Sequence, residues 1–427
     1  MDTSAEALDK KGLISWALFD WANSAFPTII ITFIFATYFT QGIATDKITG
    51  TAQWGYAMSL SALGVAFFSP FLGAIADQTG SRKPWLMFFT LIAVTSSGLL
   101  WFSTPDTSSL FWVLIFVGLG NFAFEAGMVF YNAMLPDISP KRLIGRISGW
   151  AWGAGYAGGL ICLVIALIGF VQTDVPWFGI TTKNAEHIRA TSILVAVWYL
   201  VFSLPLFLFT SDKAPTHIGI APAISKGVST LLSTLIRVRH YKQIVRYLFA
   251  RMLYTDGLNT LFAFGGIYAA GTFGFTFTEI IQFGIAINVT SGLGAAGFAW
   301  IDDWIGPKKT IIISITALII LGLTILTIES KILFWIFGLM LGIFVGPAQA
   351  ASRSLMAHLA PPELRTEMFG LYSFAGKATA FLGPAAFAVA TDFFQSQRAG
   401  MATIIIFFVI GGLFLVLVDE PNRVTVD

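Results

Sequence analysis

Long apolar stretches, separated by short polar ones, follow one another along the whole chain. A helix needs about 20 mostly apolar residues to cross the hydrocarbon core of a bilayer. Twelve stretches satisfy this condition: 14–40, 54–76, 84–103, 109–134, 147–171, 190–210, 246–270, 278–300, 309–328, 332–357, 367–391 and 400–418. The pattern predicts an all-α membrane protein with twelve transmembrane helices.

The composition agrees with a membrane protein. Hydrophobic residues make up 56% of the 427 residues and charged residues only 11%, whereas soluble domains contain about 25% charged residues. The formal net charge of +2 gives no sign of a nucleic-acid partner. Cys162 is the only cysteine, so no disulfide forms within the chain, and the four histidines lack metal-ligand spacing. We therefore expect neither a metal nor a cofactor.

Lysine and arginine predict the orientation of the chain. One set of connections contains most of the basic residues and includes both termini. The other set contains only Lys47, Lys183, Arg189, Lys331 and Arg398. Because basic loops face the cytoplasm, both termini are expected there, which requires an even number of spans. The first apolar stretch is too long for a signal peptide and lacks a cleavage site, so we expect no cleaved leader.

Several motifs occur twice, once in each half of the chain. Residues 20–26 and 256–262 share Asp, Asn and Phe at the same spacing, and the polar turn 73–84 returns in weaker form at 303–309. This repeat predicts two six-helix bundles, residues 1–210 and 246–427, joined by a basic cytoplasmic linker, 211–245. Such a repeat is typical of secondary transporters. Part of the linker, about 226–242, has the pattern of an amphipathic surface helix.

Charged and amide side chains inside the apolar stretches are candidates for a transport site. Deep charges occur only on the first, fourth, seventh, tenth and eleventh predicted helices, and each costs at least about 2.5–3.5 kcal/mol at mid-bilayer. They are therefore expected to face one polar cavity or to pair with each other. The candidate set is Asp20, Asn23, Asn121, Glu125, Asp256, Asn259, Gln349, Arg353 and Lys377. The alternative is that Asp20 and Asp256 merely cap or pack a helix near the membrane surface.

The repeated polar turn is a candidate gate. Its glycines permit close packing and a tight turn, and its basic residues lie where headgroups and helix C-termini favour them. The candidate gating residues are Gly73, Asp77, Gly80, Arg82, Lys83, Asp303 and Gly306. An ordinary basic turn is the alternative, and the recurrence in both halves argues against it.

These features resemble the major facilitator superfamily, whose signature loop between helices 2 and 3 is similar to residues 73–83. Within it, residues 19–26, 131–159, 254–264 and 346–384 resemble the bacterial branch of the vacuolar amino-acid effluxer family linked to autophagy in fungi. The resemblance covers nearly the whole chain, although Gln78 stands where a basic residue is common. It implies a central cavity lined by helices 1, 4, 7 and 10, amino-acid export, and a location in the bacterial inner membrane.

Residues of both signs suit a zwitterion such as an amino acid. In this hypothesis Arg353, with Lys377 as second choice, meets an anionic group of the substrate. Asp20, Glu125 and Asp256 meet a cationic group or exchange a proton. Asn23 and Asn259 form hydrogen bonds with the substrate, or else satisfy backbone groups freed near Pro27. The alternative for Arg353 is an ion pair with an acid that only holds the halves together.

Other functions fit the sequence less well. The glycines and lysine of residues 370–378 have the wrong spacing for a phosphate-binding loop and lack its Ser/Thr, so an ATP-driven pump is rejected. An enzyme that uses Asp20 and Asp256 as a carboxylate pair is a formal alternative. A membrane sensor on the same fold is another, although the chain has no soluble domain to carry a signal. An exporter of a different metabolite or of a drug is the alternative within transport. We take a monomer as the default oligomeric state.

Overall fold

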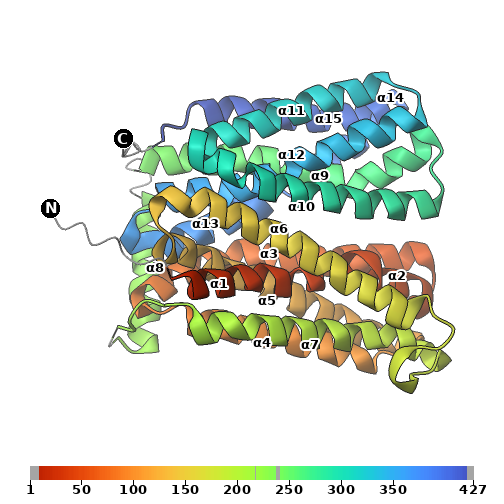
Figure 1. Ribbon diagram of the computed structural model, residues 1–427, viewed down its shortest axis with the longest axis horizontal. Helices are drawn as coiled ribbons and strands as arrows, with labels where there is room; N and C mark the ends of the chain where they lie inside the picture. Colours follow the sequence, from red (N-terminus) through yellow and green to blue (C-terminus); the bar gives the residue numbers. More distant parts are fainter. Residues whose placement is uncertain (1–8, 217, 237–240, 421–427) are drawn as a thin grey trace. The chain divides into compact units, whose positions relative to one another are not determined.

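The computed structural model describes residues 9–216, 218–236 and 241–420, and within them all regular structure is helical (Figure 1). The α-helices are α1 Lys10–Asn23, α2 Phe35–Tyr38, α3 Lys47–Thr79, α4 Lys83–Leu99, α5 Leu110–Ile138, α6 Ile144–Ala166, α7 Glu186–Phe209, α8 Ile220–Ile236, α9 Lys242–Phe273, α10 Phe277–Ile305, α11 Pro307–Thr327, α12 Lys331–Leu359, α13 Arg365–Lys377, α14 Leu382–Phe394 and α15 Gln397–Val416. π-Helical segments follow α1 and α6, at Phe26–Phe33 and Leu167–Val171, and another, Phe39–Ile43, follows α2.

All twelve predicted spans fall on helices. In the described part of the chain, 10 helical stretches are long and apolar enough to cross a membrane. The other two predicted spans coincide with α9 and with α13 and α14. Helix α9 is long enough, at 32 residues, but basic residues and Asp256 lower its hydropathy. The eleventh span is divided into two helices of 13 residues each, separated at residues 378–381.

The linker contains a helix, but at a different place from the predicted one. Helix α8 begins at Ile220 and ends at Ile236, whereas the pattern predicted about 226–242, of which residues 237–240 lie outside the described residues. Ala223, Gly227 and Leu231 are buried along one face of α8, as the four-residue spacing requires. The termini whose cytoplasmic location was predicted, 1–8 and 421–427, also lie outside the described residues.

The chain forms two compact units, and α3 contributes to both. Residues 1–61 and 80–215 form the first unit, while 62–79 and 216–427 form the second. The polypeptide therefore passes between the units within α3, after α3 and again after α7. In the second unit, Thr216 donates its backbone N–H to the carbonyl of Thr79 at 2.9 Å. This hydrogen bond holds the start of the linker against the end of α3.

Helix α1 is the central element of the first unit, where it packs against α6 and α7. The Trp16 ring stacks on Tyr131 of α5 at 4.4 Å. Each side chain also donates to the other residue's carbonyl, both at 3.1 Å. On α6, a Cβ at Gly158 would overlap the backbone of Trp21. Small residues thus bring α6 close to α1, as is usual where helices pack in membranes.

Helices α10 and α12 pack closely in the second unit through three glycines, Gly294, Gly342 and Gly346. A Cβ at Gly294 would overlap the carbonyl of Ile343, and one at Gly346 would overlap the carbonyl of Ser291. Each helix therefore presents a glycine to the other helix's backbone. This close packing holds α12, with its buried Arg353, in a fixed place in the second unit.

Candidate functional site

Asp20 and Asn23 occupy the last turn of α1, and both are buried, with 5% and 2% of their surface exposed. Asn23 donates from Nδ2 to the sulfur of Met128 on α5 at 3.4 Å. Shortly afterwards the π-helical segment Phe26–Phe33 begins, with Pro27 as its second residue. π-Helical turns are frequent at functional sites. The two predicted residues therefore adjoin a local irregularity of the helix that carries them.

Two candidates, Asn121 and Glu125, lie one turn apart on α5. Asn121 donates from Nδ2 to Ser61 Oγ of α3 at 2.9 Å, and both residues belong to the first unit. Glu125 follows one turn later and is partly exposed. The amide of Asn121 thus joins α3 to α5, which is a structural use of a residue that the sequence placed in the transport site.

The second copy of the Asp–Asn motif is divided between two environments. Asp256 is only 2% exposed, and its Oδ2 accepts from the N–H of Gly383, in the first turn of α14, at 3.0 Å. Its Oδ1 is buried and has no hydrogen-bond partner among the described residues. Asn259 is exposed. Asp256 thus caps α14, as in the alternative in which this acid only caps or packs a helix. Its Oδ1 is still available to a ligand or a proton.

The remaining candidates are on α12 and α13. Arg353 is 1% exposed, within a buried stretch near the end of α12. Gln349, one turn earlier, and Lys377, the last residue of α13, are partly exposed. Next to Arg353, the carbonyl of Ser352 accepts from Tyr247 Oη at 2.6 Å. Ser352 therefore belongs to a buried polar contact of α12 with α9, and Arg353 follows it in the same buried stretch of α12.

Arg251 of α9 belongs to the same region, although our candidate set omitted it. Its guanidinium lies over the Tyr372 ring of α13, with Cζ 3.4 Å from the ring centroid. Its Nη1 donates to the Tyr372 carbonyl at 2.7 Å, and Tyr254 Oη lies 2.7 Å from Ser352 Oγ. The sequence does contain a signal for this cluster. Tyr247, Arg251 and Tyr254, at spacings of four and three, share one face of α9.

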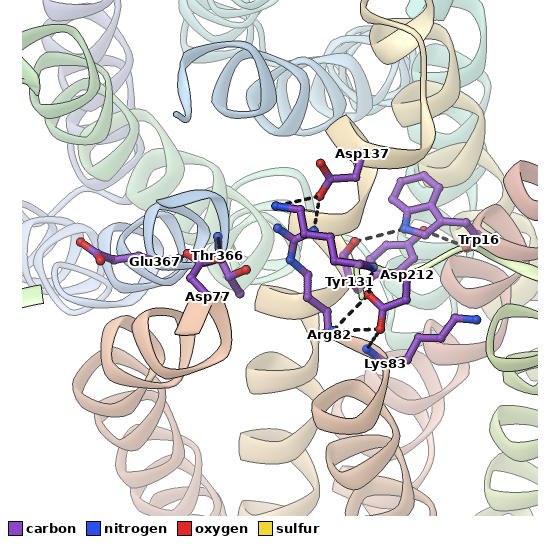
Figure 2. Close-up of polar contacts among 10 residues, drawn as sticks. Trp16, Asp77, Arg82, Lys83, Tyr131, Asp137, Asp212, Thr366 and Glu367 are labelled. Carbon is purple, nitrogen blue, oxygen red and sulfur yellow. Dashed lines mark hydrogen bonds and ion pairs between the residues drawn. The ribbon is translucent and has the colours of Figure 1, made fainter. Parts of the chain in front are cut away.

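In the second unit, Asp77 near the end of α3 caps the N-terminus of α13 (Figure 2). Its carboxylate accepts from the backbone N–H groups of Thr366 and Glu367 at 3.1 and 2.8 Å. A carboxylate at a helix N-terminus satisfies orphan N–H groups and complements the helix dipole. Gly73 makes the approach possible, because a Cβ there would overlap the carbonyl of Thr366.

The rest of the turn makes its contacts within the first unit. Gly80 has a φ of +83°, a left-handed conformation that glycine adopts readily. The Arg82 guanidinium forms an ion pair with Asp137 at the end of α5. The Asp212 carboxylate accepts from the backbone N–H groups of Arg82, at 3.0 and 3.1 Å, and of Lys83, at 2.9 Å (Figure 2). A pocket of about 250 Å³ adjoins these residues. The turn is thus fixed to the ends of α5 and α7.

The echo of this turn in the second unit has the same architecture. Glu420 accepts from the backbone N–H of Lys308 at 2.7 Å, as Asp212 does from Lys83. Lys308 Nζ donates to the backbone carbonyl of Val416 at 2.9 Å, and Lys83 Nζ donates to the backbone carbonyl of Phe207 at 3.1 Å. In the first unit an acid just after α7 caps the N-terminus of α4, and in the second an acid just after α15 caps the N-terminus of α11. We call each arrangement an acid clamp.

The other parts of the second turn were also among the candidates. Gly306 has a φ of +104° where α10 ends and α11 begins. Asp302 is 3% exposed, and Asp303 is partly exposed. The echo includes the clamp and the turn geometry. Sequence reasoning missed Asp212 and Glu420, because both lie outside the repeated motifs.

An arginine holds the opposite end of each of these helix pairs. In the first unit, Arg189 of α7 donates from Nε to the carbonyl of Trp101, just after α4, at 2.6 Å. In the second, Arg398 of α15 donates to the carbonyls of Leu326 and Ile328, at the end of α11, at 2.7 and 2.8 Å. Cations at helix C-termini satisfy free carbonyls and oppose the dipole. Helices α4 and α7, and likewise α11 and α15, are therefore fastened at both ends.

Replacing Asp212 with alanine is expected to lower the stability of the first unit by about 1–2 kcal/mol, the usual cost of losing a helix cap. The reason is that the N–H groups of Arg82 and Lys83 lose their acceptor. The measurement is thermal unfolding of the purified protein in detergent. Asp174→Ala is the control, since that exposed acid makes no recorded contact. Equal melting temperatures for the two variants would show that the clamp carries no stability.

Comparison with known proteins agrees with this architecture. Residues 42–424 match the protein family described as "Vacuole effluxer Atg22 like". The chain is 26% identical over 420 residues to the uncharacterized MFS-type transporter YxiO of Bacillus subtilis, covering 97% of this chain and 96% of the relative. It is 21% identical over 448 residues to autophagy-related protein 22 of Coccidioides immitis, covering 86% of this chain and 72% of the relative.

Solved structures show the same fold. The proton:xylose symporter XylE matches with a TM-score of 0.75 at 12% identity, covering 97% of this chain and 96% of that one. The E. coli fucose:proton symporter FucP matches with a TM-score of 0.68 at 16% identity, covering 96% and 98%. The predicted all-α major facilitator fold is therefore confirmed. The chain belongs to the Atg22-like vacuole effluxer family and is a multi-pass major facilitator transporter, not an enzyme.

Proposed function

We propose that this transporter exports an amino acid by alternating access, coupled to protons, and that its chain is organised as two six-helix bundles, residues 1–210 and 246–427. The linker 211–245 joins the bundles. The observation that carries the proposal is the pair of buried carboxylates, Asp20 and Asp256, at matching places in the first helix of each bundle. Intramembrane acids are costly and usually mark a substrate or proton pathway. The family description, vacuole effluxer, supports export.

The roles in this site follow from charge. Arg353, with Lys377, meets the anionic group of the substrate, and Asp20, Glu125 and Asp256 meet its ammonium group or exchange protons. The uncompensated Oδ1 of Asp256 supports a role beyond capping. Four amide side chains form hydrogen bonds with the substrate: Asn23, Asn121, Asn259 and Gln349. The protein lies in the bacterial cytoplasmic membrane with both termini cytoplasmic, as the distribution of lysine and arginine predicts.

Gating is assigned to the turn after α3 and its echo after α10. We assign the cap of Asp77 on α13 as a gate contact. The division of α3 supports this assignment, because α3 begins in one unit and ends in the other. Opening of this contact frees α3 from α13. Gly73 permits the contact, while Gly80, Arg82 and Lys83, with Asp303 and Gly306 in the echo, anchor the turns on which it depends.

The test is counterflow of radiolabelled amino acids in proteoliposomes with an imposed pH gradient. We expect uptake of at least one neutral amino acid that depends on the gradient, is at least about tenfold slower in Asp20→Asn and Arg353→Ala, and is unchanged in Asp174→Asn. The loss is expected because each substitution removes a charge-assisted contact, which is worth about 1.5–3 kcal/mol. No counterflow of any amino acid by folded protein would contradict the substrate and leave a transporter of another solute.

A further inference from the structure

We propose that Arg251 binds the carboxylate of the transported solute, with the Tyr372 ring as the floor of the site. This inference rests on the proposed transport function and deepens it, because it names a further cation that meets the carboxylate of the substrate. It also places the anion contact on α9 and α13, in addition to the Arg353 contact on α12. The contacts of the guanidinium, the space around it and its depth in the helix support this assignment.

Arg251 is a cation without an acidic partner in the described part of the chain. Its recorded contacts are with Tyr372, through the ring face and the backbone carbonyl. Its Nε is buried and has no hydrogen-bond partner. Arginine stays protonated at any physiological pH, so the charge cannot be relieved by losing a proton. A carboxylate on the solute would supply the missing opposite charge, and a charged group inside a membrane span is costly without one.

The geometry leaves one edge of the guanidinium for a ligand. Nη1 is used by the Tyr372 carbonyl, whereas Nε and Nη2 form no recorded hydrogen bond among the described residues. These two nitrogens form an edge that matches the two oxygens of a carboxylate. Stacking on the Tyr372 ring fixes the plane of that edge. Arg251 is partly exposed while its Nε is buried, so a solute reaches this edge from the Nη2 side.

Neighbouring residues keep this place open and rigid. A Cβ at Gly376, one turn after Tyr372, would lie 2.8 Å from Nη1 and 3.3 Å from Nη2 of Arg251, so glycine there leaves room for the guanidinium. Tyr247 and Tyr254, on either side of Arg251 along α9, both contact Ser352 of α12. Arg251 lies nine residues after the first residue of α9, or about 14 Å along the helix axis. The site is therefore inside the predicted span and is built from three helices of one unit.

The test measures binding to the purified full-length protein separately from transport. The probes are the twenty standard amino acids, lactate and succinate, each scored by its effect on thermal unfolding, and the amide of the tightest-binding acid. We expect Arg251→Gln to weaken binding of that acid by about 10–100-fold, because a charge-assisted contact is lost. The amide should bind the wild type weakly and should bind the variant equally weakly. Arg251→Lys should restore only part of the affinity, since lysine lacks the planar fork.

Arg246→Gln is the matched control, because it makes the same change at an exposed arginine of the same helix, and its affinity should stay close to that of the wild type. A structural role for Arg251 would lower the melting temperature of unliganded Arg251→Gln and leave its affinity for the acid unchanged. That result would overturn the inference, as would a wild-type protein that binds none of the carboxylates. The first result leaves amino-acid counterflow by the wild type untouched and removes only this site, whereas the second also contradicts the amino-acid substrate of the proposed function.

Discussion

Replacing Gly346 with valine is expected to prevent α10 and α12 from packing, so that little folded protein is recovered. A Cβ at this position would overlap the carbonyl of Ser291, which is backbone of the facing helix and has no rotamer through which to move away. Overpacking a well-filled site costs about 1–3 kcal/mol even where side chains can adjust, and here a whole helix must shift. The measurement is the yield of monodisperse protein after size exclusion in detergent, with the melting temperature of whatever is recovered.

Gly297 of α10 provides the control for this substitution. A Cβ at Gly297 has nothing within 4 Å of it, so Gly297→Val should be recovered at close to the wild-type yield. Both variants add the same β-branched side chain to a helix interior, and they differ in what that side chain meets. Similar yields for the two would mean that contact with the facing helix does not limit folding.

Replacing Asp77 with asparagine is expected to slow transport at least about tenfold without preventing folding. The asparagine keeps one oxygen that can accept a hydrogen bond, but it loses the charge that faces the N-terminus of α13 and one of the two acceptors for the N–H groups of Thr366 and Glu367. Hydrogen bonds to charged groups contribute about 1.5–3 kcal/mol, which corresponds to a shift of about 10–100-fold between states with and without the cap. The measurement is the initial rate in proteoliposomes.

Gln78→Ala is the control for the gating residue, because no contact of the Gln78 side chain is recorded. Binding affinity should be unchanged in Asp77→Asn, since Asp77 contacts the first turn of α13 and Arg251 contacts Tyr372 later in that helix. A rate equal to that of the wild type would contradict the gating role. It would mean that Asp77 only caps α13. A loss of binding together with rate would instead place Asp77 in the substrate site.

Much of the fold could be predicted from the sequence, because hydrophobic length is a local property. All twelve predicted spans fall on helices, and the repeated turn after the second span was found from its residues alone. Helix α9 and the pair α13 and α14 differ from the other spans for physical reasons: the first carries charges, and the second is broken between Lys377 and Leu382. The apolar pattern shows how long a span is, but not where its helix is interrupted.

The contacts of the candidate site were harder to predict, because they join residues far apart in the chain. The capping roles of Asp77 and Asp256 depend on α13 and α14, about 290 and 127 residues away. Asp212 and Glu420 lie outside every repeated motif, so only the folded chain shows that they have equivalent capping roles in the two units. The division of α3 is also invisible in the sequence, since residues 47–79 form one unbroken helix.

The acid clamps have a consequence for how the protein is made. The acid that closes each clamp follows the last helix of its unit, so α4 is not secured until residue 212 has been synthesised, and α11 is not secured until residue 420. Because domains generally fold in order as they emerge from the ribosome, the clamp of the first unit can close while the second is still being translated. The second clamp needs Glu420, so α11 is secured only after α12, α13, α14 and α15 have been synthesised.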